Sequence, residues 1–187
     1  TSTVAMGAVS ARGCGVAPDT FRWMWEVEMT RMLVIYFSVT GNTRALAEAV
    51  VRGVKSVDGT RCVLMPADEV TNQDWLAADA IIVGSPTYFG QMATDVKEVI
   101  DATAEIYGQL EGKVGAAFTT SGGAGCGHEL TNMSIITALL VSGMVVQGTT
   151  QGPHFGPFAV GKPTAKDLEK AEAMGVRVAQ LTQKLFD

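Results

Sequence analysis

Residues 32–43 read MLVIYFSVTGNT, an apolar run followed at once by three hydroxyl side chains, a glycine and an amide. Such an apolar run is typical of a strand that is buried on both faces of a sheet. The next stretch, residues 44–55, has apolar residues at three- and four-residue spacing, which is the period of an amphipathic helix. The polar residues therefore lie where a buried strand meets the start of a helix.

The remainder of the chain repeats this alternation of short apolar runs and longer segments of helical period. Strands alternating with helices favour a parallel sheet covered by helices on both faces. We therefore predict a three-layer α/β sandwich with a five-stranded parallel sheet, in one domain over residues 32–187. The predicted strands are 32–37, 61–65, 80–85, 113–120 and 144–148, and the predicted helices are 44–55, 72–77, 91–107, 129–142 and 164–185.

Residues 1–31 show neither a helical nor an alternating period, and we expect them to form an extension outside the core. They lack the basic start and the continuous apolar stretch of a secretion signal. Their Ala, Ser and Arg content loosely resembles an organelle targeting peptide, which is one alternative. Another is translated sequence upstream of a start at Met29 or Met32.

Composition and charge exclude several classes of protein. The 187 residues are 47% hydrophobic with a formal charge of -5, which favours a globular protein and argues against nucleic-acid binding. No window has the roughly 18 uninterrupted apolar residues that a membrane span needs. Three scattered cysteines, Cys14, Cys62 and Cys126, fit thiols in a reducing cytoplasm. The two histidines have no cysteine or carboxylate at ligand spacing, so we predict no metal site.

The loop after the first strand is the first candidate site, because ligands of such sheets bind beyond the carboxyl ends of the strands. The helix behind it directs unpaired N–H groups and the positive end of its dipole into the loop. Together with side-chain donors around a glycine, these amides suit a phosphate group held without a cation. The alternative is that the side chains only cap the helix. The candidate residues are Ser38, Val39, Thr40, Gly41, Asn42 and Thr43.

Other phosphate-binding classes do not match this loop. It lacks the lysine of the GxxxxGK[ST] loop that binds nucleoside triphosphates, and it lacks the GxGxxG pattern of a dinucleotide site. A response regulator would need an aspartate at the end of the third strand, where this chain has Ser85. We exclude these three classes.

The run Val34–Thr43, VIYFSVTGNT, resembles the flavodoxin family. The first loop of that family follows an aliphatic-aromatic strand as Ser or Thr, two residues, a small residue, one more residue and Thr. The resemblance covers residues 32–185 and implies the strand order 2-1-3-4-5. It also implies a bound flavin mononucleotide (FMN), whose terminal phosphate lies in this loop.

The loop after the third strand resembles the segment that surrounds the flavin ring in one branch of the family, the NAD(P)H:quinone oxidoreductases of the tryptophan-repressor-binding-protein type. An aromatic pair between a proline and a glycine offers a flat surface and backbone donors to a planar ring. The alternative is a turn whose aromatic side chains pack into the core. The candidate residues are Pro86, Thr87, Tyr88, Phe89 and Gly90.

The loop after the fourth strand, TTSGGAGCGHE at residues 119–129, has so few side chains that its N–H groups can approach a ligand closely. In the family this loop lines the flavin, where amide dipoles would stabilise the reduced ring. A flexible linker is the alternative. We expect Cys126 to be a packing residue, since it has no CxxC partner. The candidate residues are Thr120, Ser121, Gly122, Gly123, Ala124 and Gly125.

The resemblance leaves two functions open. In the first, an enzyme passes a hydride from NAD(P)H to the flavin, and a quinone-like acceptor takes two electrons in the same place without a catalytic side chain. In the second, the protein is a one-electron carrier between redox proteins. The mild charge favours the enzyme, and TGNT at residues 40–43 favours the carrier. A binding module without redox chemistry is a third, minor alternative.

Three positions depart from the enzyme branch, which commonly has Tyr, Arg and His where this chain has Thr40, Tyr88 and Ser142. Flavin binding therefore transfers to this chain better than catalysis does. Tyr107 and His154 are candidates for the substrate pocket. A neighbouring subunit often completes the flavin site in this branch, so a homo-oligomer, dimer or tetramer, is also open.

Overall fold

The computed structural model describes residues 29–186. The strands are β1 (Thr30–Tyr36), β2 (Thr60–Pro66), β3 (Ala80–Pro86), β4 (Val114–Ser121), β5 (Val145–Val146) and β6 (Phe158–Val160). The helices are α1 (Asn42–Lys55), α2 (Asn72–Ala77), α3 (Thr94–Asp101), α4 (His128–Val141) and α5 (Ala165–Phe186), with short 3-10 helices η2 (Ala67–Glu69) and η3 (Ala102–Ile106).

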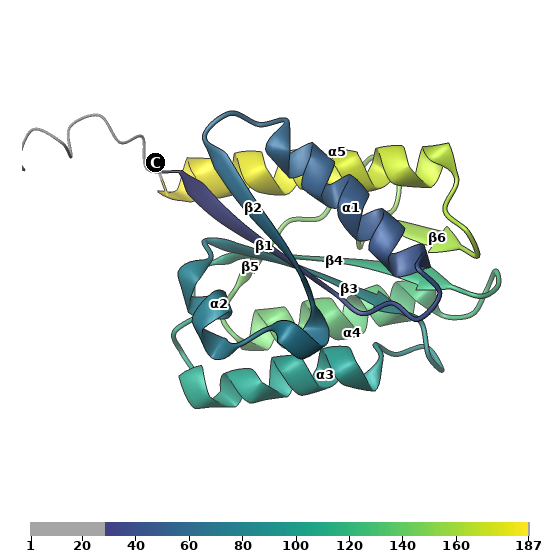
Figure 1. Cartoon of the computed structure of the whole chain (residues 1–187), viewed down its shortest axis with the longest axis horizontal. Coiled ribbons are helices and arrows are strands. Elements are labelled where there is room, and N and C mark those ends of the chain that lie inside the picture. The colour runs from purple at the N-terminus through teal and green to yellow at the C-terminus, as the bar shows by residue number, and fades with distance from the viewer. Residues whose placement is uncertain (1–28, 187) are drawn as a thin grey trace, which may run out of the picture.

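The strands form one parallel sheet in the order β2-β1-β3-β4-β5, with β6 paired to β4. Helices α1 and α5 cover one face, and α2, α3 and α4 cover the other (Figure 1). This arrangement confirms the predicted three-layer sandwich and the predicted strand order. No helix within residues 29–186 has both the length and the apolar character that crossing a membrane requires.

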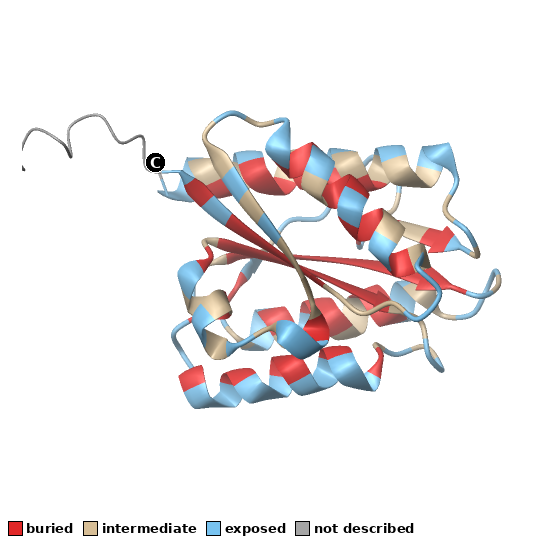
Figure 2. Cartoon of the chain, in the orientation of Figure 1, coloured by how far each residue is buried: buried red, intermediate tan, exposed pale blue. Residues whose placement is uncertain are grey.

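The central strands contribute to two hydrophobic cores, because successive side chains of a strand point to opposite faces. Met32 and Val34 of β1 pack with α1 and α5, whereas Leu33 and Ile35 pack with residues of α2, α3 and α4. Every residue of β4 is buried, and the sheet interior in Figure 2 is buried along its length. Burial on both faces explains why the central strands contain short apolar runs rather than an alternation of apolar and polar residues.

Helices α1 and α5 lie side by side on their face of the sheet (Figure 1). A Cβ atom on Gly53 of α1 would lie 2.0 Å from the Glu172 carbonyl oxygen of α5. A Cβ atom on Gly175 of α5 would lie 2.2 Å from the Val50 carbonyl oxygen of α1. The two glycines therefore allow the helix backbones to touch.

The edge of the sheet differs from the prediction. The apolar run 144–148 forms only the two-residue β5, after which the chain leaves the sheet and returns as β6 beside Thr119–Ser121. Sequence reasoning missed β6, although its residues are a short apolar run between a proline and a glycine. Within the described chain, residues 116–118 of β4 have no strand partner on this side.

Other boundaries shift by a few residues. Strand β1 begins at Thr30, before the predicted run, and the predicted helix 91–107 is the shorter α3 followed by η3. The prediction for residues 1–31 falls outside the described residues, apart from its last three positions.

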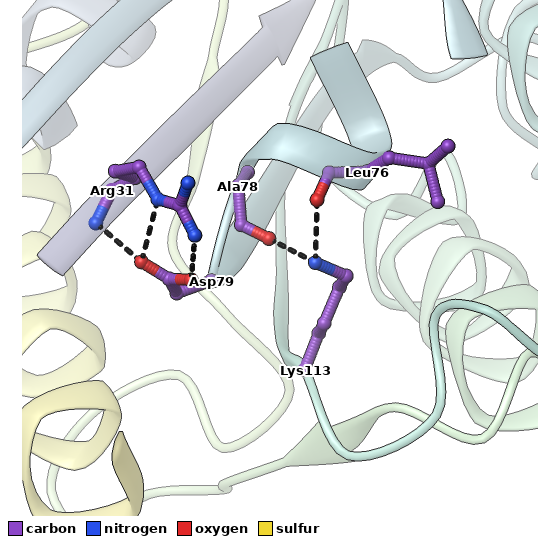
Figure 3. Close-up of polar contacts among 5 residues, drawn as sticks. All are labelled: Arg31, Leu76, Ala78, Asp79 and Lys113. Atoms are coloured by element: carbon purple, nitrogen blue, oxygen red, sulfur yellow. Dashed lines mark hydrogen bonds and ion pairs between the residues drawn. The ribbon is translucent and has the colours of Figure 1, made fainter. Parts of the chain in front are cut away.

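A charged cluster joins the amino ends of β1, β3 and β4 (Figure 3). The Arg31 side chain donates to both carboxylate oxygens of Asp79, at 3.2 and 2.9 Å, and the Arg31 backbone N–H donates at 2.8 Å. The Lys113 ammonium donates to the carbonyl oxygens of Leu76 and Ala78 at the end of α2. Burial opposes ionisation of Asp79, but its bonds with Arg31 and the nearby Lys113 charge lower the pKa of this carboxyl overall.

We expect this cluster to stabilise the folded protein at neutral pH and to lose that contribution in acid. Because the pKa of Asp79 is lower in the folded chain, its contribution is fully present above its unfolded pKa, about 3.9, and is lost as pH falls through its folded pKa. Since Arg31 is mostly exposed to solvent, Asp79→Asn should lower the free energy of unfolding by only about 1 kcal/mol at neutral pH. Urea unfolding at neutral pH and near pH 3 checks this. An equal effect of the substitution at both pH values would contradict it.

Candidate functional site

The three candidate loops meet at the carboxyl ends of β1, β3 and β4. Thr43 Oγ1, in the first turn of α1, lies 2.8 Å from Thr120 Oγ1 at the end of β4. Thr87 Oγ1 lies 3.1 Å from Thr119 Oγ1, and the Thr87 N–H donates to the Thr120 carbonyl oxygen at 2.7 Å. Hydroxyl pairs therefore tie the first and second loops to the third.

The second and third loops also touch through their backbones. A Cβ atom on Gly127, which precedes α4 with a φ of 86°, would lie 2.9 Å from Gly90 Cα. Beside this contact, the Thr131 hydroxyl donates to the Gln91 carbonyl oxygen at 3.3 Å. Only a residue without a side chain fits at position 127, so the glycines here serve packing between loops as well as access for a ligand.

The first loop presents the amino terminus of α1 without a side-chain cap. Gly41 precedes the helix with a left-handed φ of 85°, and no side chain caps the terminus. Ala45 is the first residue whose N–H bonds back into the helix, to the Gly41 carbonyl oxygen at 3.0 Å. The preceding N–H groups have no intrahelical acceptor. The structure therefore does not support the alternative that these polar side chains only cap the helix.

Ser38 supplies the observation that tests whether a phosphate fits. Its Oγ atom is buried and has no hydrogen-bond partner among residues 29–186. A buried hydroxyl left in this state costs about 1–3 kcal/mol. An anion in the loop would accept its hydrogen bond, together with those of the free N–H groups at the start of α1. The residues present therefore fit the phosphate that the sequence predicts.

A cavity of about 420 Å³ lies beside this loop. Ser38 and Gly41 line it from the first loop, and Asp68 and Asp95 line it from η2 and α3. Arg44 also lines it, but its guanidinium forms an ion pair with Glu48 at 2.9 Å. The nearby cation therefore already has a carboxylate partner, which agrees with a loop that binds an anion through neutral donors.

The second loop holds its aromatic pair in a tight turn. Tyr88 and Gln91 exchange two backbone hydrogen bonds of 3.0 Å, and the residues between them, Phe89 and Gly90, have φ values of 52° and 75°. Two positive φ angles in this position define a type I′ turn. Tyr88 is 44% exposed and Phe89 fully exposed, so the alternative that these rings pack into the core is wrong.

Phe89 is an unusual residue for this turn, and replacing it gives a stability prediction. A bulky residue at positive φ carries strain of about 1–3 kcal/mol, whereas Asn followed by Gly is the preferred pair for a type I′ turn. Because the Phe89 ring buries nothing in the described chain, Phe89→Asn should raise the free energy of unfolding of the flavin-free protein by about 1 kcal/mol. Urea unfolding measures this. A destabilised variant would show that the ring packs against something.

The third loop begins as part of the sheet and then opens to solvent. Thr120 and Ser121 still pair with β6, and the Ser121 hydroxyl donates to the Gly123 carbonyl oxygen at 3.0 Å. A side chain at Gly122 or Gly125 would meet nothing within 4 Å. The start of this loop is therefore anchored, and its open backbone leaves room for a ligand.

Several residues that position the loops were missed. Ser85 Oγ accepts the Ala93 N–H at 2.8 Å and donates to the Pro86 carbonyl oxygen at 2.8 Å, so it links the two ends of the second loop. The His128 ring stacks on Phe158 of β6, with ring centroids 3.8 Å apart. Ser85 could have been chosen as a candidate from its hydroxyl at the end of a predicted strand. The stack of His128 on Phe158 could not, because it depends on β6, which was not predicted.

The structure does not bring the two substrate-pocket candidates to the three loops. Tyr107 is 77% exposed and follows η3, at the opposite end of α3 from the second loop. His154 lines a separate cavity, and its Nδ1 lies 2.8 Å from the Thr149 carbonyl oxygen. Their role in a substrate pocket stays a prediction. Within the described range, no group of three His, Cys, Asp or Glu side chains is placed to hold a metal.

Comparison with known proteins identifies the family. Residues 59–153 match the family described as NADPH-dependent FMN reductase. The chain is 38% identical over 160 residues to a flavodoxin of Aquifex aeolicus, with 81% of this chain and 86% of the relative covered. It is 35% identical over 190 residues to an NAD(P)H dehydrogenase (quinone) of Archaeoglobus fulgidus, with 84% of this chain and 100% of the relative covered.

A solved structure gives the same answer. The flavodoxin, WrbA-like protein from Agrobacterium tumefaciens has a TM-score of 0.72 and 28% sequence identity, with 83% of this chain and 98% of that chain covered. The resemblance inferred from the first two loops is therefore confirmed. The chain belongs to the flavodoxin-like family of NADPH-dependent FMN reductases, nearest its tryptophan-repressor-binding-protein branch.

Proposed function

We propose that this protein is an FMN-dependent oxidoreductase that transfers two electrons from NAD(P)H to a quinone-like acceptor. Family membership confirms the predicted FMN cofactor and the oxidoreductase class. The observation that carries the proposal is the buried hydroxyl of Ser38, which has no partner among residues 29–186 and lies in a loop of free helix N–H groups. It supports the proposal that the terminal phosphate of FMN binds in this loop.

The first loop would hold the phosphate of FMN through neutral donors. Ser38 and Thr40 offer hydroxyls, and the N–H groups at the start of α1 offer backbone donors. Thr43 can donate as well when Thr120 donates to it, since either oxygen of that pair can act as the donor. Because a dianion interacts strongly with several such donors, no lysine or arginine is needed.

The second and third loops would hold the flavin ring. The turn from Pro86 to Gly90 presents Tyr88 and Phe89 as exposed aromatic surface, and the backbone of residues 122–125 offers amide donors. FMN, when bound, supplies the hydride acceptor and the electron donor of the reaction. The side chains of this chain bind and orient the ring, and none has to act as an acid or base.

An anaerobic reduction experiment tests this function. We expect NADPH or NADH to bleach the flavin absorbance of the purified protein rapidly, and a benzoquinone to restore it. A one-electron carrier is the second candidate, favoured by the 38% identity to a flavodoxin. If neither nucleotide bleaches the flavin although dithionite does, the enzyme is excluded and the carrier is supported.

The acceptor, the compartment and the assembly are finer parts of the same proposal. We propose a small quinone as acceptor, supported by the relative named NAD(P)H dehydrogenase (quinone). A reducing cytoplasm is supported by the free thiols of Cys62 and Cys126. The exposed Val39 and Phe89 beside the site favour a homo-oligomer in which a neighbouring subunit covers the flavin.

A further inference from the structure

A second cavity lies at the edge of the sheet, and none of its lining residues belongs to the three loops. Its volume is about 240 Å³. It exists because β5 leaves β4 after two residues, so that no described strand pairs with β4 between Gly115 and Thr119 on the side away from β3. Its walls come from β4, α4, α5 and residues 146–156. The apolar side chains of the first three walls are Ala116, Ala117, Met133, Ile136, Leu140 and Met174.

Arg177 of α5 also lines this cavity and carries a positive charge, and no carboxylate lines the cavity. Its Nε atom is buried and has no hydrogen-bond partner among residues 29–186. No ion pair within that range includes it. Burial lowers the pKa of the Arg177 guanidinium, and no neighbouring charge offsets this effect. The chain therefore holds a partly buried cation beside an apolar space, an arrangement that an anion would stabilise.

We propose that this cavity binds a small amphipathic carboxylate, whose charged end pairs with Arg177 and whose apolar body lies against Met133, Ile136 and Met174. A guanidinium matches a carboxylate in shape and charge, and ligand pockets generally combine apolar walls with a few polar groups. Gln147 and His154 are the other polar side chains of the wall. The cavity is smaller than the roughly 300–1,000 Å³ of sites for drug-sized ligands, which indicates a short fatty acid or a simple aromatic acid.

The site is independent of the flavin. Its walls share no residue with the first loop (residues 38–43) or with the second loop (residues 86–90). Binding can therefore be measured on the FMN-loaded protein without reference to electron transfer. Failure of this proposal would leave the proposed function untouched, and the reverse also holds.

Titration with matched six-carbon probes tests the proposal. Hexanoate should shift the NMR signals of the Gly148 and Gly156 amides and the Met133 and Met174 methyl groups saturably, while hexylamine should not. Arg177→Met keeps the apolar stem and removes the cation, so it should weaken hexanoate binding by about tenfold to a hundredfold. Arg177→Lys should retain part of the affinity. Arg52→Met, the same change at an exposed arginine of α1, should leave the affinity unchanged.

Three results would overturn the proposal. One is the absence of a saturable shift with hexanoate and also with benzoate, which offers a different apolar body. Another is equal affinity for hexanoate and hexanol, because this would show that pairing of the carboxylate with Arg177 does not contribute to binding. The third is unchanged hexanoate affinity in an Arg177→Met variant that keeps wild-type thermal stability and FMN content.

Discussion

Replacing Ser38 with Ala and Thr43 with Val together should weaken FMN binding by about a hundredfold or more, so that the protein purifies without its flavin. In the proposed site each hydroxyl would donate a hydrogen bond to a charged phosphate, and such bonds contribute about 1.5–3 kcal/mol. The Ser38 hydroxyl has no partner within the described chain, so Ser38→Ala alone removes no hydrogen bond among residues 29–186. Titration of the apoprotein with FMN, followed by quenching of flavin fluorescence, measures the change.

Riboflavin provides the decisive control for this prediction. It carries the same ring but no phosphate, so its affinity should differ by less than about threefold between wild type and the double variant. Thr137→Val, at an exposed hydroxyl of α4, should change neither affinity. Equal weakening of FMN and riboflavin would mean that the substitutions damage the fold. Unchanged FMN affinity would mean that the phosphate lies elsewhere.

The central part of the fold could be predicted because its signal is local. Strands β1, β3 and β4 are buried on both faces over most of their length, so each contains a short run of apolar residues in the sequence. The edge beyond β4 also has short apolar runs, but these do not show which strand they pair with. Pairing of β6 with β4 depends on a return of the chain from residue 147 to residue 158, and neither segment shows in its own residues that they flank the same strand.

The site shows the same division between local and long-range information. Ser38 and the loop around it were found from residue types at a helix start. Thr119 was not, because its pairing with Thr87 depends on the register of β3 and β4. The left-handed backbone of Phe89 had no signal either, since turns of this type usually have Asn, Asp or Gly there. Tyr107 was proposed from the resemblance, as the counterpart of an aromatic residue that covers the substrate pocket, whereas the structure has it after η3, at the far end of α3 from the second loop.

Replacing Gly175 with Ala should destabilise the protein by about 3 kcal/mol, although the same change at an exposed helix position normally stabilises by about 1 kcal/mol. The new Cβ atom would lie 2.2 Å from the Val50 carbonyl oxygen and 2.9 Å from the Val54 N atom, both of them backbone atoms of α1. Backbone cannot rotate away as a side chain can, so α1 and α5 must move apart and open the core between them.

The amino terminus of α1 belongs to the loop that we propose holds the phosphate, so displacement of this helix by Gly175→Ala should also weaken FMN binding, by about threefold or more. Ala173→Gly, at an exposed position of the same helix, measures the intrinsic helix preference and should cost about 1 kcal/mol with no change in FMN affinity. Urea unfolding of the two apoproteins gives both free energies. If Gly175→Ala proves neutral or stabilising, the two helix backbones do not touch. The contact between α1 and α5 then does not hold the first loop in position.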